Sequence, residues 1–198
     1  MPKRDSRYME EQRNQIAGAA WEVMLAKGLY ETSLRDICQQ AGVSMGALYV
    51  HFASKEDIVL AALVLNRSDW GDQPVAATWD EYSSRIWLLS EELLQPAGRR
   101  GVRLTFQFLA ERLLEPSQST ALSRIFLEND RFARESLRAM ADSGEITLPL
   151  GMDLTADAHV RLMTGTSYTI LANPAVDARK AYADSMKAMA HLAGRIEG

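Results

Sequence analysis

The part of the chain best suited to chemistry is a run of mostly small residues followed by two polar rings. It consists of Ser44, Met45, Gly46, Ala47, Tyr49 and His51. Small side chains at the start of a helix let its backbone approach base edges in a DNA groove, and the phenol and imidazole behind them can reach phosphate oxygens. These residue types at this spacing point to contact with DNA, provided that one helix carries them all.

Residues 33–52, SLRDICQQAGVSMGALYVHF, predict two short helices joined by a tight turn. Ser33 is expected to cap the first helix, with Asp36 completing a capping box, and Ser44 to cap the second. Gly42 permits the positive φ that the turn needs. The inward positions are all apolar: Leu34, Ile37, Ala41, Val43 and Leu48. This spacing is typical of a helix-turn-helix, whose second helix is presented to DNA.

The rest of the chain also shows helical periodicity, and no convincing run alternates as a strand does. An amphipathic helix is expected to precede the motif and to stop at Gly28, and Ser54, with Asp57 three residues on, is expected to cap the helix after it. Further helices are predicted over residues 79–94, 102–114, 119–140, 155–171 and 176–193. The sequence therefore predicts an all-α fold of about nine helices.

The composition is that of an ordinary globular protein, because 47% of the 198 residues are hydrophobic and 24% are charged. No apolar stretch approaches the roughly 20 residues that a membrane span needs, and no apolar segment of a signal peptide follows the basic N-terminus. Cys38 is the single cysteine, which excludes an internal disulfide and a cysteine-based zinc site. We expect a cytoplasmic protein with no membrane partner.

The charge is spread unevenly along the chain. The net charge is −4, from 22 Lys and Arg against 26 Asp and Glu, which argues against indiscriminate binding to nucleic acid. Residues 1–55 carry 7 basic and 6 acidic side chains, whereas residues 56–198 carry 15 basic and 20 acidic ones. Any DNA-binding surface must therefore be a small patch in the N-terminal part.

From Gly28 through Leu60 the chain contains the elements Gly-aromatic, Thr-Ser, Ala-Gly-Val-Ser and Leu-Tyr-x-His-Phe-x-Ser-Lys in order. This stretch resembles the DNA-binding domain of the TetR/AcrR family of bacterial transcription factors, and the rest of the chain is similar to that family only in length and helix count. The resemblance implies a helix-turn-helix domain over residues 1–55 and a ligand-binding and dimerisation domain over residues 56–198. The terminal Arg-Ile-Glu-Gly at 195–198 is interpreted as a linker remnant.

The resemblance also implies DNA-contacting roles for individual residues. They are Arg35, Ser44, Met45, Gly46, Ala47, Tyr49, His51 and Lys55. Arg35 is suited to a bidentate contact with guanine, with a solvated surface arginine as the alternative. Tyr49 and His51 match the family's phosphate-contacting pair, and Lys55 lies where a helix N-terminus and an ammonium can hold one phosphate. Met45 is apolar, so Arg35 or DNA shape carries more of the specificity.

For the larger domain, the resemblance implies a small-molecule ligand and pairing with a second copy through the last two helices. Aromatic residues interspersed with polar ones on the central helices are compatible with a partly apolar pocket. The candidates are Trp87, Phe106 and Phe126, each with packing in an ordinary core as its alternative. On the last two helices, periodicity does not separate a dimer interface from an intramolecular core.

An enzyme is the main competing class of protein. The histidines His51, His159 and His191 are far apart in sequence, and neither an HExxH motif nor a Gly-rich phosphate loop occurs. Cys38 falls on the apolar side of a predicted helix, where a buried thiol is inert. We expect no catalytic residue, no metal and no cofactor, and an enzyme built from residues distant in sequence is the remote alternative.

The predicted function is that of a ligand-responsive, sequence-specific DNA-binding transcriptional regulator. We expect a homodimeric repressor that a small molecule releases from a palindromic operator, because a dimer bound over a promoter blocks polymerase by occupancy. A transcriptional activator, or a regulator controlled by a protein partner, is the alternative.

Overall fold

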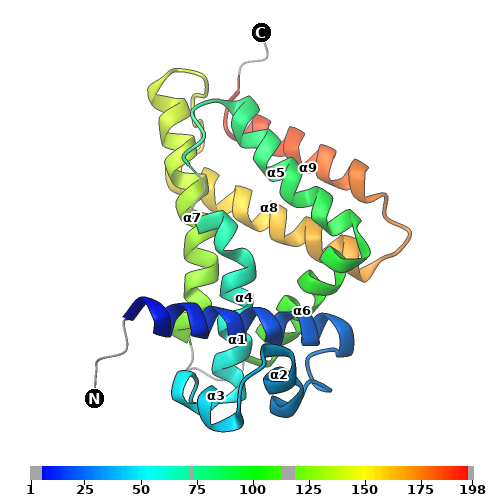
Figure 1. The fold of residues 1–198 in the computed structure, drawn as a ribbon. Helices are drawn as coiled ribbons and strands as arrows, with labels where there is room; N and C mark the ends of the chain where they lie inside the picture. The colour runs from blue at the N-terminus through cyan, green and yellow to red at the C-terminus, as the bar shows by residue number, and fades with distance from the viewer. Residues whose placement is uncertain (1–5, 72–73, 113–118, 196–198) are drawn as a thin grey trace. The chain divides into compact units, whose positions relative to one another are not determined.

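The computed structural model describes residues 6–71, 74–112 and 119–195, apart from the side chains of residues 67–71, 89, 92, 112 and 119–129. These residues form nine α-helices and no strand, which confirms the predicted all-α fold (Figure 1). The helices are α1 (Ser6–Lys27), α2 (Leu34–Ala41), α3 (Met45–His51), α4 (Lys55–Gly71), α5 (Trp79–Leu94), α6 (Pro96–Arg112), α7 (Ser119–Asp142), α8 (Met152–Ala172) and α9 (Ala178–Leu192).

The chain packs as two compact units. The first comprises residues 1–69 and 104–125, and the second comprises residues 70–103 and 126–198. Helices α4, α6 and α7 each contribute residues to both units. The units are defined by packing and not by function, so the predicted division into domains at residue 55 stays a prediction.

Local sequence signals set the ends of the first helices. α1 stops before Gly28, which has a φ of 96° and donates its N–H to the carbonyl of Met24 at 2.8 Å. The predicted capping box starts α2, since the Ser33 hydroxyl accepts from the N–H of Asp36 at 3.2 Å and the Asp36 carboxylate accepts from the N–H of Ser33 at 3.0 Å. Gly42 ends α2 with a φ of 68°. Glycine adopts such positive φ values without a steric cost.

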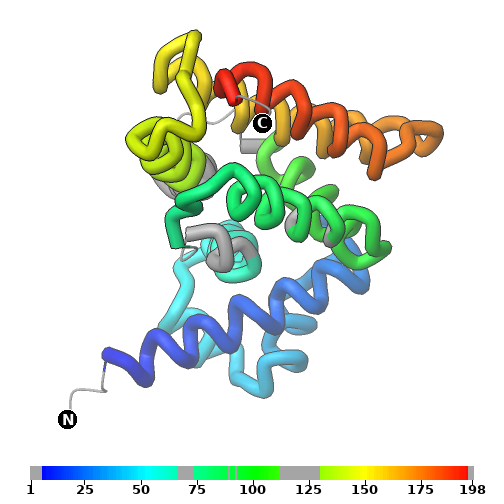
Figure 2. The backbone as a smooth tube through the Cα atoms, turned by 90° about the horizontal axis from the view of Figure 1, so that it is seen from above, coloured from blue at the N-terminus to red at the C-terminus, as the bar shows by residue number. Residues whose placement is uncertain are grey.

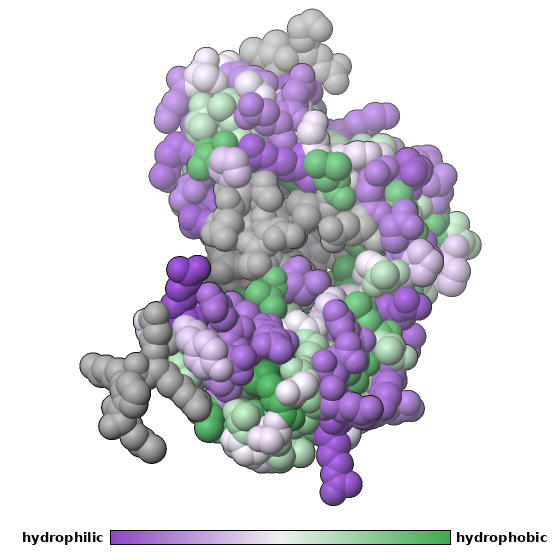
Figure 3. Space-filling model, in the orientation of Figure 1, coloured by the Kyte–Doolittle hydropathy of each residue, from purple (hydrophilic) through white to green (hydrophobic). Residues whose placement is uncertain are grey.

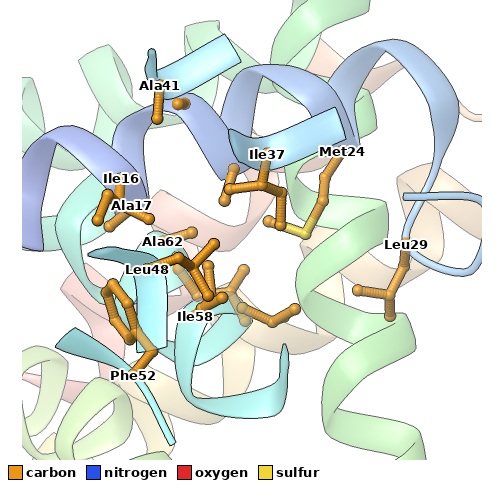
Figure 4. Packing of buried hydrophobic residues seen from close by; sticks show 14 of the residues in the cluster. Ile16, Ala17, Met24, Leu29, Ile37, Ala41, Leu48, Phe52, Ile58 and Ala62 are labelled. Carbon is orange, nitrogen blue, oxygen red and sulfur yellow. The ribbon is translucent and has the colours of Figure 1, made fainter. Parts of the chain in front are cut away.

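Hydrophobic side chains from five helices form the core of the first unit, and Figure 4 shows most of them from close by. They include Ile16, Ala17, Ala20 and Met24 of α1, Ile37 and Ala41 of α2, Leu48 of α3, Ile58, Ala62 and Leu63 of α4, and Leu104 and Phe108 of α6. α3 has seven residues and is too short to be stable alone. Its attachment therefore depends on Leu48, which is 1% exposed, and on Phe52 directly after it, which is 2% exposed.

The core of the second unit is aromatic and contains a buried histidine. Tyr82 of α5 stacks on Phe132 of α7 with ring centroids 5.5 Å apart, and its hydroxyl lies 3.2 Å from Nδ1 of His159 on α8. Nε2 of His159 lies 3.0 Å from the carbonyl oxygen of Met189 on α9. A carbonyl only accepts, so Nε2 carries the hydrogen and Nδ1 accepts from Tyr82. His159 thus joins α8 to α5 and α9, and Tyr82 extends the contact to α7.

α8 and α9 lie side by side in the second unit (Figures 1 and 2). The hydroxyls of Thr166 and Ser185 are 2.6 Å apart, and those of Ser167 and Tyr182 are 3.1 Å apart. Met189 is fully buried between the helices of this unit. Periodicity alone does not tell whether the small and soft side chains of α8 and α9 form a dimer interface or an intramolecular core. The side chains named here pack within one chain.

The end of the described chain belongs to the fold of the second unit. Arg195 forms an isolated β-bridge with Ile146, donates from Nη2 to Asp80 at 3.2 Å and lies over the ring of Trp79 at 5.7 Å. Arg195 packs against α5 and the loop after α7, and its interpretation as part of a linker remnant stays a prediction. Residues 196–198 of that remnant lie outside the described residues.

Two of the later helices start earlier than periodicity predicts. α6 begins at Pro96, where the sequence suggested a break, because proline is tolerated in a first turn that has no use for its missing N–H. α8 begins at Met152 rather than near residue 155, directly after Gly151 with its φ of 76°. Periodicity does not predict these two starts, because the first turns contain residues of weak helix propensity, which a helix tolerates at its N-terminal end.

Hydrophobic residues form separate patches among hydrophilic ones on the face that Figure 3 shows. In the described ranges, no helix has both the length and the apolar character that crossing a membrane requires. Within the same ranges, no three His, Cys, Asp or Glu side chains gather in a way that would hold a metal ion.

Candidate nucleic-acid interface

The second helix of the predicted motif is α3, and its first turn is capped as expected. The Ser44 hydroxyl accepts from the N–H of Ala47 at 3.1 Å, and the Ser44 carbonyl accepts from the N–H of Leu48 at 3.0 Å. Ser44 itself is extended, with ψ at 157°. The cap fixes the residue at which α3 begins, and therefore which of its side chains face outward.

One face of α3 is turned to solvent. Gly46, Tyr49 and Val50 are exposed, with Tyr49 at 54% and Val50 at 60%, and Ala47 and His51 are half-buried. Residues three and four apart lie on the same side of a helix, so Gly46, Tyr49 and Val50 form one surface. Val50 is not among the predicted contacts, although its position four residues after Gly46 places it on that face.

Met45 differs from its neighbours because part of its side chain is packed inward. It lies against the core of the first unit, with its Sδ 4.0 Å from Sγ of Cys38 on α2. Burial raises the pKa of the Cys38 thiol, which keeps this cysteine protonated and unreactive. Packing therefore occupies much of Met45, and the small residues Gly46 and Ala47 are left for close approach to a partner.

Two polar side chains of α1 hold the C-terminal ends of α2 and α3. Gln15 donates from Nε2 to the carbonyl of Ala41 at 3.0 Å, and Arg13 donates from Nη1 to the carbonyl of His51 at 2.6 Å. The Arg13 guanidinium also lies over the ring of Phe52, 4.2 Å from its centroid. The last carbonyls of a helix have no partner within it, so these bonds satisfy them. Arg13 is not among the predicted functional residues, because its partner lies 38 residues away in the sequence.

Arg35 lies exposed on α2 beside a firmly held carboxylate. Nζ of Lys27 lies 2.6 Å from Oδ1 of Asp36. This ammonium and the hydrogen bonds from Ser33 hold the pKa of Asp36 well below its ordinary range. Arg35 makes no ion pair with any other residue that the structure describes. Its side chain is exposed, and the capping box fixes the start of its helix.

Lys55 begins α4 and is half-buried. Its Nζ donates to the carbonyl of Leu29 at 3.2 Å, which ties the loop between α1 and α2 to α4. Ser54 caps α4 as predicted, since its hydroxyl accepts from the N–H of Asp57 at 3.0 Å. The contact of Lys55 with phosphate stays a prediction, and it would have to share or replace the bond to Leu29.

All the residues predicted to bind DNA belong to the first unit. Six lie on α3 or at its cap, one on α2 and one at the start of α4: Ser44, Met45, Gly46, Ala47, Tyr49, His51, Arg35 and Lys55. Together these eight residues supply hydrogen-bond donors and small apolar groups. Such a set of groups suits noncovalent binding to a polyanion.

The predicted ligand-binding aromatics are divided between the two units. Trp87 is half-buried in the second unit, packed against the cluster that contains Leu93, Ile170 and Tyr182. Phe106 is half-buried on α6 and belongs to the first unit. The side chain of Phe126 lies outside the described residues. A pocket formed by these three side chains therefore stays a prediction.

The chain is similar to known regulators in its sequence. Residues 16–62 match the family model described as bacterial regulatory proteins, tetR family. Over 186 residues the chain is 26% identical to the HTH-type transcriptional regulator UidR of Escherichia coli K12, a match that covers 89% of this chain and 90% of that protein.

The fold is similar to solved structures of such regulators. A TetR-family transcriptional regulator from Rhodococcus sp. matches with a TM-score of 0.75 at 21% identity, covering 93% of this chain and 99% of that one. SmeT, solved as a complex with triclosan, matches with a TM-score of 0.68 at 19% identity, covering 91% of this chain and 90% of that one. At these identities the likeness shows a shared fold.

Proposed function

Because this chain belongs to the TetR family of bacterial regulatory proteins and is a helix-turn-helix transcriptional regulator, we propose that it is a homodimeric repressor released from a palindromic operator by a small molecule. The observation that carries the proposal is the outward face of α3, where Gly46 and Tyr49 are exposed on a helix that is capped at its start and held at its end by Arg13. A protein that acts on bacterial DNA works in the cytoplasm, which is the location we propose.

In this proposal α3 lies in the major groove. Gly46 and Ala47 let the helix approach base edges, and Val50 offers methyl groups to the methyl of thymine. Tyr49 and His51 donate to phosphate oxygens on the flanking backbone. The two kinds of contact have different roles, since contacts with phosphates fix the register of the protein on DNA and contacts with base edges supply the sequence preference.

The residues around α3 complete the proposed interface. Arg35 reads a guanine, because a guanidinium can donate to two acceptors of that base at once. Lys55 and the capped start of α4 hold a phosphate, and Ser44 adds a polar group at the edge of the groove. Met45 takes part only with the portion of its side chain that packing leaves accessible.

We place the dimer contact on the outward face of α8. Leu154 is 55% exposed and Tyr168 is 60% exposed, and Arg161 and Gly165 between them are exposed too. These residues are three, four and seven apart, so they share one helix face. A second copy that covers this face and the neighbouring face of α9 would make a symmetric bundle of four helices.

Gly165 gives a clean test of that contact, since a side chain added there meets nothing within 4 Å in one chain. We expect Gly165→Gln to lower the molecular mass measured by light scattering from that of a dimer to that of a monomer. Ser84→Gln, at an exposed position on α5, is the matched control. A dimer that persists in Gly165→Gln would move the contact elsewhere.

The effector is proposed to be a small, partly apolar molecule bound by the larger domain. SmeT has the same fold and was solved with triclosan, which supports a ligand of that kind. Residues 54–68 would transmit binding to the recognition helices, which must lie one DNA turn apart, about 34 Å, in a dimer. A ligand that favours a different separation weakens operator binding by its differential affinity for the two states.

The experiment is selection of bound duplexes from a random DNA pool with the purified protein. An enriched inverted repeat is expected, because a symmetric dimer reads two equivalent half-sites. No enrichment, by the protein as purified and again after refolding to remove bound ligand, would contradict the proposal. A reporter behind the selected site then separates a repressor from an activator by the sign of its response to deletion of the regulator.

A further inference from the structure

We propose that Arg13 is a positioning residue, which sets the orientation of α3 against the first unit without touching DNA itself. The inference rests on the proposed DNA binding, since it concerns the helix that meets the groove. Arg13 lies on α1, outside the helix-turn-helix. Its guanidinium contacts the carbonyl of His51 and the ring of Phe52, at the C-terminal end of α3.

α3 has few other attachments. Leu48 is its only fully buried residue, and Phe52 is buried directly after it. Apolar contacts fix how deeply a helix sits, but they are not directional, so they constrain its rotation weakly. The bond from Nη1 of Arg13 to the carbonyl of His51 is 2.6 Å long and depends on angle as well as distance. It therefore restrains the end of α3 in a way that the core does not.

The chemistry of arginine suits both of its contacts. A positive charge is favourable at a helix C-terminus, where the peptide dipoles point their negative ends. Cζ of Arg13 also lies 4.2 Å from the centroid of the Phe52 ring, within the range of a cation–π contact, while Nη1 donates to the carbonyl of His51. Lysine has the charge but not the plane, so it cannot reproduce both contacts.

The test uses Arg13→Gln and Arg13→Lys in the full chain, with Arg7→Gln as the matched control. Arg7 is exposed on the same helix and bonds Glu11 within it. Two quantities are measured for each protein. The first is amide hydrogen exchange over residues 48–52 in the free protein, and the second is the ratio of affinities for the selected duplex and a scrambled one, over a range of salt concentrations.

We expect residues 48–52 to exchange about tenfold faster in Arg13→Gln and the affinity ratio to fall about tenfold, as the loss of one charged hydrogen bond allows. The salt dependence of binding should stay unchanged, because no phosphate contact is lost. Arg13→Lys should fall between wild type and Arg13→Gln, and Arg7→Gln should keep the wild-type ratio.

Two results would overturn the proposal. An unchanged affinity ratio and unchanged exchange would remove any positioning role. Equal losses on both duplexes, with the salt slope reduced by about one, would make Arg13 a phosphate contact instead. Wild-type protein that prefers no duplex would contradict the proposed function, and the exchange data would still decide whether Arg13 fixes α3.

Discussion

The hydrogen bonds that fix the helix-turn-helix of the first unit and those in the aromatic core of the second unit differ in the sequence separation of their partners. Ser44 caps α3 through a residue three positions away, and Gly42 sets the turn by its own backbone. Tyr82 meets His159 across 77 residues. The ends of the two motif helices are thus set by local signals, and the bond from Arg13 to His51 adds one long-range restraint. The second unit depends mainly on packing that no short segment encodes.

The strongest way to break the first unit is to remove the anchor of α3. Leu48→Ala is expected to lower the free energy of unfolding by about 3 to 4 kcal/mol, because it leaves a cavity at a fully buried position. Binding to the selected duplex should be lost with it. Leu88→Ala, at a leucine that is 66% exposed, is the matched control and should change stability little. Denaturant unfolding followed by circular dichroism measures both, and equal losses would contradict the account.

Acid should weaken the second unit through His159. Burial lowers the pKa of His159 to about 4, from an ordinary value of 6.5. Between these values the unfolded chain binds a proton that the folded protein does not, so stability is full above pH 6.5 and falls by about 3 kcal/mol as the pH drops to 4.

His159→Gln is expected to flatten that loss, since an amide can donate to Met189 and accept from Tyr82 without titrating. His191→Gln, at an exposed histidine on α9, should keep the wild-type pH dependence. Thermal unfolding between pH 4 and pH 7 gives the comparison. An unchanged acid limb in His159→Gln would show that another group is responsible.

Substitution of two glycines with positive φ separates the cost of backbone strain from the cost of steric crowding. At Gly42 an added Cβ meets nothing within 4 Å, so Gly42→Ala should cost only the left-handed conformation, about 1 to 2 kcal/mol. At Gly194 the Cβ would also lie 2.7 Å from Cδ of Pro149, so Gly194→Ala should cost about 1 kcal/mol more. Gly42→Ala should weaken DNA binding and Gly194→Ala should not. The reverse pattern, measured by unfolding and by gel shift, would contradict this assignment of roles.

The smallest expected effect comes from the cap of α3. Ser44→Ala should lower the free energy of unfolding by about 1 kcal/mol, because the N–H of Ala47 loses its acceptor. Ser44→Asn restores an acceptor and should restore most of that stability. Urea unfolding of the two variants checks this, and equal stability of Ser44→Ala and wild type would count against the cap.

Local signals made the first unit predictable from sequence. The capping box of Ser33 and Asp36, the turn at Gly42 and the caps at Ser44 and Ser54 each involve residues at most three apart, and each is found as predicted. Hydrophobic periodicity also predicted that all the regular structure would be helical. Such features depend on short-range geometry, which the order of residues expresses directly.

Long-range packing was not predictable in the same way. The bond of Arg13 to His51 and the burial of His159 depend on which helices meet, and periodicity says only which face of a helix is apolar. For the same reason the sequence did not show that Met45 packs partly inward or that Arg195 lies over Trp79.

The most direct test is amide hydrogen exchange of the whole protein with and without the selected duplex. The account predicts slower exchange over residues 33–55 in the complex, strongest at α3, and smaller changes in the outward-facing parts of α5. A scrambled duplex at the same concentration should give weaker protection over the same residues. Protection centred outside residues 33–55, or equal protection by both duplexes, would contradict the claim that α3 reads DNA sequence.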